Sequence, residues 1–232
     1  MSKARLVLVR HGQSVYNQKN IFTGWTDVDL SQQGRNEAKK AGLLLKKNSI
    51  YPHICFTSWL KRAIHTAQIA LQELEWEHID MLKSYKLNER HYGDWQGRDK
   101  DAVKKEYGDE KFLAVRRGYD VAPPPLHVKD ERCVWNDKKY ANIDKKLLPL
   151  HESLKDTKKR VLEYYTEQIV PQLQKEKTVL ISAHGNSLRA LVMELEQMTP
   201  QEIVQFEIPT GEIIVYDFDR EMKIIEKNVL IG

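Results

Sequence analysis

Short apolar runs alternate with longer amphipathic segments along most of this chain, a pattern that predicts strands alternating with helices. Two of the runs, residues 5–9 and 178–183, are rich in branched side chains, and each leads into a histidine–glycine pair. Further strands are expected at 53–57, 79–82, 213–216 and 224–230. Short, continuously apolar runs are typical of strands that are buried on both faces of a parallel sheet. We therefore predict an α/β fold with a mostly parallel central sheet and helices on both of its faces.

Apolar residues at helical spacing predict amphipathic helices between these strands. One helix is expected after Ser31 and another after Ser58, because serine is a preferred N-cap residue. A charged helical stretch is expected at roughly 99–117, and a long amphipathic helix from Ser153 through Leu173. A last helix is expected directly after the second histidine–glycine pair.

Three segments lack a steady period and are predicted to be irregular. Residues 13–30 and 87–97 are polar and are expected to form ordered loops. Residues 118–150 contain three consecutive prolines and many charges, and an ordered irregular segment of this length is often a lid or a binding loop. We expect 118–150 to be an insertion that covers the functional site within a single domain, 1–232.

The composition is that of a globular protein and argues against two classes of partner. Of the 232 residues, 41% are hydrophobic and 30% are charged, and the net charge is +4. Lysine and arginine are interspersed with acidic residues and do not form the basic stripe of a nucleic-acid binder, so no nucleic-acid partner is expected. No apolar run approaches the roughly 20 residues that cross a bilayer, so no membrane partner is expected either.

The two cysteines, Cys55 and Cys133, are too few and too far apart to suggest a disulfide framework or a zinc site. Cys55 lies within an apolar run and is expected to be a reduced core residue. The first residues, Met1–Arg5, lead directly into a strand without the apolar region of a signal peptide. Both observations favour a cytoplasmic protein.

The two histidine–glycine pairs place His11 and His184 at the carboxyl ends of predicted strands. Ligands of open α/β sheets bind at that edge, so the two histidines are expected to share one site. Arg10 adjoins His11, and Arg62 lies in the first turns of a helix that begins at the same edge. Such a cluster of cationic groups implies a bound anion, and guanidinium groups suit phosphate. Histidine can act there as nucleophile, acid or base.

Two other interpretations of these histidines remain open at this point. A histidine at a strand end can be buried, hydrogen-bonded and inert. A metal site would also use two histidines, but it normally includes carboxylate or thiolate companions at recognisable spacing. The companions here are arginines, which oppose a cation, so no metal is expected.

Seven blocks of sequence, in order, carry a resemblance over nearly the whole chain. They are Leu8–Asn17, Phe22–Trp25, Lys61–Thr66, Leu87–Gly93, Arg116–Gly118, Ala183–Arg189 and Ile208–Gly211. Arg10-His11-Gly12 resembles the signature of the histidine phosphatase superfamily. Together the blocks resemble the cofactor-dependent phosphoglycerate mutases within that superfamily.

The resemblance implies catalytic roles that elementary chemistry supports. His11 would be the nucleophile that takes a phosphoryl group on its ring nitrogen, and nearby arginines favour its reactive neutral form. Arg10, Arg62 and His184 would hold the phosphoryl oxygens, because phosphoryl transfer depends mostly on positioning and charge neutralisation. Glu89 would donate and accept the proton of the substrate hydroxyl; the alternative is a solvated loop carboxylate.

By the same resemblance, the substrate site would be lined by Asn17, Thr23, Gly24, Tyr92, Lys100, Arg116, Arg117, Gly185 and Asn186. Taken one at a time, Lys100, Arg116 and Arg117 are also typical of ordinary surface charges. Their charge suits a substrate that carries both a phosphate and a carboxylate.

The resemblance implies an isomerase that interconverts 3-phosphoglycerate and 2-phosphoglycerate through phosphohistidine. 2,3-Bisphosphoglycerate would be both intermediate and priming cofactor, without a metal, and relatives are often homodimers or homotetramers. The alternatives on the same fold are a histidine-dependent phosphatase and a bisphosphoglycerate mutase. Thr23-Gly24 disfavours the bisphosphoglycerate mutase, and Arg116-Arg117 disfavours the phosphatase. A non-catalytic phosphate-binding scaffold would need neither His11 nor Glu89.

Three features depart from the pattern of the family. Gln13 and Tyr16 stand where many relatives have glutamate and tryptophan. The sequence ends at Gly232, shortly after the last predicted strand, whereas many relatives carry a further flexible tail. We expect this end to leave the phosphohistidine more exposed to water and to raise phosphatase leakage; negligible hydrolysis of the phosphoenzyme would contradict that expectation.

Overall fold

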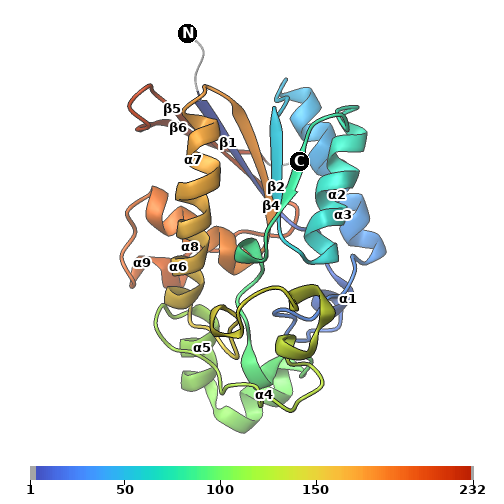
Figure 1. Cartoon of the computed structure of the whole chain (residues 1–232), viewed down its shortest axis with the longest axis vertical. Helices are drawn as coiled ribbons and strands as arrows, with labels where there is room; N and C mark the ends of the chain where they lie inside the picture. Colours follow the sequence, from blue (N-terminus) through green and yellow to red (C-terminus); the bar gives the residue numbers. More distant parts are fainter. Residues whose placement is uncertain (1–3, 231–232) are drawn as a thin grey trace.

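The computed structural model describes residues 4–230 and is built around one six-stranded sheet in the order β3-β2-β4-β1-β5-β6 (Figure 1). Its strands are β1 (Ala4–Arg10), β2 (Ile54–Thr57), β3 (Met81–Lys83), β4 (Thr178–Ala183), β5 (Ile213–Phe218) and β6 (Ile224–Leu230). Strands β3, β2, β4 and β1 are parallel neighbours, whereas β5 and β6 join in antiparallel pairing. The predicted α/β fold with a mostly parallel sheet is confirmed. The first residues, Met1–Lys3, and the chain end at Gly232 lie outside the described residues.

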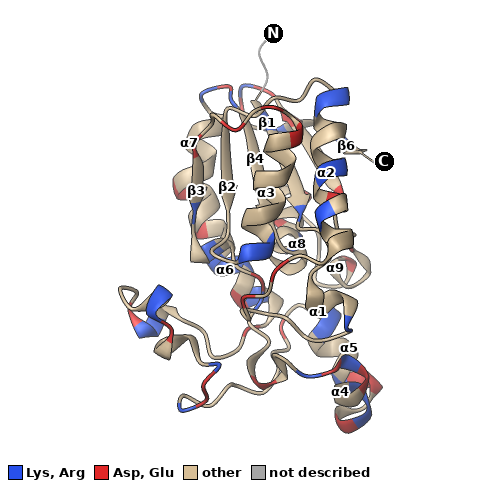
Figure 2. Cartoon of the chain, turned by 90° about the vertical axis from the view of Figure 1, so that its right-hand side faces the viewer, with Lys and Arg blue, Asp and Glu red and all other residues tan. Residues whose placement is uncertain are grey.

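Helices cover both faces of this sheet (Figure 1). On one face lie α2 (Gln32–Lys47) and α3 (Lys61–Glu73), and on the other lie α6 (Leu154–Tyr164), α7 (Val170–Leu173) and α8 (Gly185–Leu195). Alternate side chains of β1 enter the two cores: Leu6 and Leu8 pack on the α6–α8 side, and Val7 and Val9 on the α2–α3 side. The central strands are largely free of charged residues, as Figure 2 shows, which fits their burial on both faces.

The remaining helices lie beyond the carboxyl ends of the parallel strands (Figure 1). They are α1 (Val15–Gln18), α4 (Lys100–Tyr107), α5 (Asp109–Arg117) and α9 (Glu202–Gln205). The charged stretch predicted as one helix is therefore two, because Gly108 adopts a φ of 81° that no α-helix continues through. The predicted loop 13–30 contains α1, which Ser14 opens by a capping box with Asn17.

The predicted N-cap at Ser31 is confirmed, since its side chain accepts a hydrogen bond from the Gly34 N–H. The predicted N-cap at Ser58 is wrong: α3 begins at Lys61, after Leu60. The hydroxyl of Ser58 instead accepts from the Leu60 N–H at 3.1 Å and lies 2.7 Å from His184 Nε2. Asp27, from a distant loop, accepts from the Lys61 N–H at 2.8 Å. A tertiary contact thus replaces the local cap.

The long helix predicted from Ser153 through Leu173 is present but is not uniformly α-helical. A π-helical turn at Tyr165–Ile169 separates α6 from α7. Pro171 lies just after this turn and has no N–H to donate to the carbonyl four residues before it. The widened turn accommodates that missing bond.

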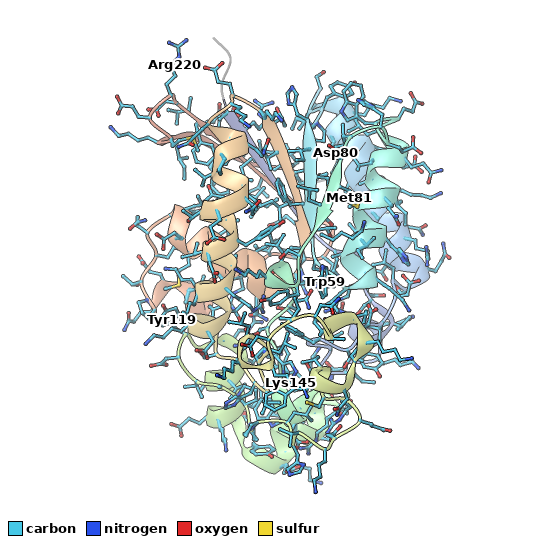
Figure 3. The ribbon with its side chains drawn as sticks, in the orientation of Figure 1. Trp59, Asp80, Met81, Tyr119, Lys145 and Arg220 are labelled. Carbon is cyan, nitrogen blue, oxygen red and sulfur yellow. The ribbon has the colours of Figure 1, made fainter. Side chains whose placement is uncertain are left out.

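The segment 118–150 contains no α-helix or strand, as predicted, and only three short 3-10 turns interrupt it. Val134, Tyr140 and Leu148 pack with Trp25 and Tyr85 in a separate apolar cluster. Figure 3 places Trp59, which packs on the Tyr140 ring, just beyond the strand ends. The role of this segment as a lid stays a prediction.

Gly34 allows α2 to approach the chain that follows β1. A Cβ atom built at Gly34 would lie 2.0 Å from the Gln13 carbonyl oxygen. Alanine is favoured over glycine inside a helix by about 1 kcal/mol, but this clash with backbone costs more. We expect Gly34→Ala to lower the free energy of unfolding by about 2 kcal/mol in a urea titration. The exposed Gln32→Ala on the same helix is the control, and a Gly34→Ala variant as stable as wild type would contradict the packing argument.

Candidate active site

A cavity of about 120 Å³ opens at the carboxyl ends of β1 and β4, where the sequence placed the site. Every predicted site residue except His184 lines it: Arg10, His11, Asn17, Thr23, Gly24, Arg62, Glu89, Tyr92, Lys100, Arg116, Arg117, Gly185 and Asn186. The lining also includes residues without a predicted role, namely Ile21, Phe22, Arg189, Glu207 and Ile208. The fold therefore brings together residues that are far apart along the chain.

His11 follows β1 and is buried, with one defined tautomer. Its Nδ1 lies 2.6 Å from the Gly12 carbonyl oxygen, which can only accept, so Nδ1 carries the proton. Nε2 therefore has the lone pair, and it accepts from Arg62 Nε at 3.3 Å. Burial, reinforced by the charges of Arg62 and Arg10, lowers the pKa of His11 well below its usual value. The ring is thus neutral at physiological pH and presents Nε2 as a potential nucleophile.

His184 is buried next to the cavity without lining it, and its ring centroid is 5.0 Å from that of His11. Its Nε2 contacts Ser58 Oγ at 2.7 Å, whereas its buried Nδ1 has no partner within the part of the chain that the structure describes. Burial and the charge of Arg62 lower the pKa of this histidine as well. A buried polar atom without a partner costs free energy, which a ligand oxygen would recover.

Arg62 is a fully buried cation and Arg10 a partly buried one, and their hydrogen bonds go to uncharged acceptors. Arg62 donates to the carbonyls of Gly24 at 2.7 Å and Thr26 at 3.0 Å. Burial lowers the pKa of Arg62 to about 10, so it stays protonated near neutral pH. Arg10 donates from Nη1 to the Ile208 carbonyl, and its Nε has no partner among residues 4–230. Buried positive charge of this kind needs an anion, and phosphate is the natural one.

Glu89 faces these cations from the loop that follows β3. Its Oε1 accepts from the Arg90 N–H at 2.8 Å and from the Asn186 N–H at 3.0 Å. Asn186 belongs to the first turn of α8, whose N-terminal end favours negative charge. The second oxygen, Oε2, is not engaged by these two donors. The carboxylate is therefore oriented through one oxygen while the other remains available for proton transfer.

A network of side chains extends from Glu89 toward the rim. Asn186 Nδ2 donates to the Tyr92 hydroxyl at 3.2 Å, and Arg90 Nη2 donates to the same oxygen at 2.9 Å. Burial raises the pKa of Tyr92, but the charge of Arg90 and these two hydrogen bonds outweigh it, and the net direction is down. Arg189 donates to Asn186 Oδ1 at 2.8 Å. These bonds fix the orientation of groups that line the cavity.

Comparison with known proteins identifies the family. The model of the histidine phosphatase superfamily, branch 1, matches residues 6–134 and 127–229. A 2,3-bisphosphoglycerate-dependent phosphoglycerate mutase of Nautilia profundicola is 51% identical over 226 residues, which are 97% of this chain and 98% of the relative. The chain belongs to the histidine phosphatase superfamily and, within it, to the 2,3-bisphosphoglycerate-dependent phosphoglycerate mutase family. The mutase of Treponema denticola is 48% identical over 97% of this chain and 92% of its own length.

Solved structures resemble this phosphoglycerate mutase family member in fold. A mycobacterial glucosyl-3-phosphoglycerate phosphatase has a TM-score of 0.74 and 22% identity, with 99% of this chain and 98% of that chain covered. The α-ribazole phosphatase of Shigella flexneri has a TM-score of 0.69 and 21% identity, with coverage of 96% and 94%. At these identities the likeness concerns the fold alone.

The charge balance of the cavity in this family member is strongly positive. Its lining has six basic side chains, Arg10, Arg62, Lys100, Arg116, Arg117 and Arg189, against two carboxylates, Glu89 and Glu207. Burial and the neighbouring Arg116 lower the pKa values of Lys100 and Arg117. Within residues 4–230, no group of three or more His, Cys, Asp or Glu residues could hold a metal ion, and no helix is long and apolar enough to cross a membrane.

Two charged residues of the cavity lining, Arg189 and Glu207, were missed by the interpretation of the sequence. Arg189 lies within a recognised block and four residues after Gly185 on α8, so helical spacing offered a signal that the two share a face. Glu207 precedes another block and pairs with Arg117 across the cavity rim. No local signal marks Glu207, because the contact depends on α5 meeting the segment after α9.

The buried histidines of this mutase family member predict a loss of stability in acid. Burial lowers the pKa of His91 to about 3, whereas the unfolded residue titrates near 6.5. Between pH 3 and pH 6.5 the His91 ring is protonated in the unfolded state but neutral in the folded state. The contribution of His91 to the free energy of unfolding is therefore fully present above pH 6.5 and is lost progressively as the pH falls. At pH 5.5 we expect His91 to contribute a loss of about 1.4 kcal/mol relative to pH 8. His11 and His184 act in the same direction.

Urea titrations at pH 8 and pH 5.5 measure this loss, and His91→Gln supplies the comparison. The variant should show a smaller pH dependence than wild type by about 1.4 kcal/mol, whatever its stability at pH 8. An equal pH dependence in both proteins would show that His91 is not the neutral buried group that the structure describes.

Proposed function

We propose that this chain interconverts 3-phosphoglycerate and 2-phosphoglycerate through a phosphorylated His11. The neutral Nε2 of His11, held by Arg62 in a cationic cavity beside Glu89, is the observation that carries the proposal. The 46–51% identity to several phosphoglycerate mutases over 97% of the chain supports the choice of substrate.

Nucleophilic attack needs the lone pair that Nε2 presents. Nε2 forms a bond to phosphorus while the bond from phosphorus to the departing substrate oxygen breaks, and that oxygen takes a proton from Glu89. The Gly12 carbonyl accepts from Nδ1 throughout and stabilises the positive charge that develops on the ring. In the return step Glu89 removes the proton of the substrate hydroxyl, the oxygen attacks phosphorus, and the N–P bond breaks.

Arg10, Arg62 and His184 would hold the transferring phosphoryl oxygens. The free buried atoms Arg10 Nε and His184 Nδ1 fit that role, since each lacks a partner among the described residues. Fixed cationic donors stabilise the charge that spreads over these oxygens in the transition state. Each step therefore requires positioning and charge, and the mechanism needs no metal.

The rest of the lining would bind the phosphate and carboxylate of phosphoglycerate. We assign this role to Asn17, Thr23, Gly24, Tyr92, Lys100, Arg116, Arg117, Gly185 and Asn186, and add Arg189. 2,3-Bisphosphoglycerate would supply the phosphoryl group that first charges His11. We further propose a cytoplasmic homodimer or homotetramer that acts on small phosphoglycerates, without a nucleic-acid or membrane partner.

Conversion of 3-phosphoglycerate to 2-phosphoglycerate in excess EDTA, with and without trace 2,3-bisphosphoglycerate, tests this proposal. We expect fast conversion that survives EDTA and is stimulated by the bisphosphate. Release of inorganic phosphate without 2-phosphoglycerate would instead indicate a phosphatase, and accumulation of 2,3-bisphosphoglycerate as the main product a bisphosphoglycerate mutase. Loss of conversion in EDTA would contradict the metal-free mechanism.

A further inference from the structure

A buried ion pair lies behind the loop that carries Glu89, outside the cavity lining. Arg160 of α6 and Glu152, just before that helix, leave only 11% and 4% of their side chains exposed. Arg160 Nε donates to Glu152 Oε1 at 2.6 Å, and Nη2 donates to Oε2 at 2.8 Å. Burying two charges is costly, and apolar residues of similar volume often pack at least as well. The pair therefore calls for a reason other than stability.

The remaining donors of Arg160 go to the backbone of one short segment. Nη1 donates to the carbonyls of Lys86 at 2.8 Å and Asn88 at 2.9 Å, and Nη2 donates to the Glu89 carbonyl at 2.9 Å. Trp25 Nε1 donates to the same Glu89 oxygen at 2.5 Å, and the guanidinium lies over the Trp25 ring at 5.4 Å. A single side chain thus holds the backbone that approaches and includes Glu89.

Glu152 holds the same segment on its other side. Its Oε2 accepts from the His91 N–H at 2.8 Å, and its own N–H donates to the His91 carbonyl at 2.9 Å. The backbone is therefore fixed immediately before, at and shortly after Glu89. Neither Glu152 nor Arg160 lines the cavity, so substrate contact does not explain these bonds.

We propose that Arg160 and Glu152 are positioning residues that set the placement of the Glu89 carboxylate for proton transfer. Orientation errors of about 1 Å at a catalytic group can reduce rates by about a hundredfold, and rigid support by surrounding hydrogen bonds prevents them. The inference rests on the proposed acid–base role of Glu89, and it extends the site to residues that only the fold brings near it.

The proposal predicts a difference between two reactions of the same enzyme. Transfer to or from phosphoglycerate needs Glu89, because an alkyl alkoxide is a poor leaving group without a proton. Transfer from p-nitrophenyl phosphate to His11 does not, because p-nitrophenolate leaves unprotonated. We expect Arg160→Gln to lower kcat of the isomerisation at least about tenfold, with KM nearly unchanged, while the rate of the first-turnover burst of p-nitrophenolate, which reports phosphorylation of His11 alone, stays within about twofold of wild type.

Arg160→Lys should restore part of the lost kcat, since it keeps the charge and some donors. Lys158→Ala is the matched control, because Lys158 lies on α6 as Arg160 does. This variant removes an ion pair of 2.8 Å with Glu194 of α8 and no contact with the Glu89 loop, so both rates should stay unchanged. If Arg160→Gln fails to fold, Glu152→Gln replaces it, because glutamine keeps an acceptor for the His91 N–H. We expect Glu152→Gln to lower kcat of isomerisation and to leave the first-turnover release of p-nitrophenolate unchanged.

Equal losses in both reactions, measured per folded molecule, would overturn the inference and reduce the pair to a structural role. An unchanged kcat of isomerisation would also overturn it. A wild-type protein that hydrolyses phosphates without isomerising phosphoglycerate would overturn the proposed function alone. In that case the same variants are assayed with an alkyl phosphate, whose leaving group needs a proton, and with p-nitrophenyl phosphate, whose leaving group does not. The inference then requires a loss of rate with the alkyl phosphate alone.

Discussion

Replacing His11 with alanine is expected to abolish both the phosphoenzyme and isomerisation. The variant loses the proposed nucleophile, the Nε2 that accepts from Arg62, whereas the cationic groups around it remain. Binding and charge stabilisation alone cannot form an N–P bond. Incubation with radiolabelled 2,3-bisphosphoglycerate, followed by denaturation in alkali, measures the phosphoenzyme, and a coupled assay for 2-phosphoglycerate measures turnover.

Two comparisons make this result specific. The variant His78→Ala changes an exposed histidine beside Trp76, far from the cavity lining, and should retain both the label and turnover. A folded His11→Ala protein should still bind phosphoglycerate, because Arg10 and Arg62 are intact. Retained turnover in His11→Ala would mean that another group carries the phosphoryl transfer, and the mechanism would be wrong.

Replacing Glu89 with glutamine is expected to lower kcat of isomerisation by roughly a hundredfold or more. Glutamine has the same shape, and its carbonyl oxygen can still accept from the N–H groups of Arg90 and Asn186. The loop should therefore keep its conformation while the proton acceptor is lost. Initial rates in both directions measure the effect, and the first-turnover burst of p-nitrophenolate, which needs no proton donor, should be preserved.

Glu207→Gln is the charge-matched comparison, since Glu207 is the other carboxylate in the cavity lining. It removes one negative charge from the same cavity, beside Arg117, but leaves Glu89 in place. We expect a far smaller change in kcat than in Glu89→Gln. Similar losses in the two variants would show that Glu89 acts through its charge on the cavity, and the acid–base role would pass to another group.

The cavity lining could be predicted largely from the sequence because recognisable blocks carry it. Arg10-His11-Gly12 follows an apolar run, and Arg62 follows another, so parallel strands deliver both to one edge. The exceptions share one cause. Glu207 lines the cavity through a contact with Arg117 on α5, and the Ser58 hydroxyl contacts His184 and does not cap α3. Such contacts depend on distant segments, which a local pattern does not encode.

The sequence by itself determined the alternation of strands and helices, the mostly parallel sheet and the edge at which the histidines meet, because these follow from short-range periodicity and from the direction of parallel strands. Only the tertiary structure decided the state of each group there. The proton on His11 Nδ1 depends on the geometry of the Gly12 carbonyl, and its lowered pKa depends on burial and on Arg62, which is distant in sequence. The bonds from Arg160 to the Glu89 loop likewise exist only once α6 packs against it, since hydrogen bonds and burial act over a few ångströms of space and not along the chain.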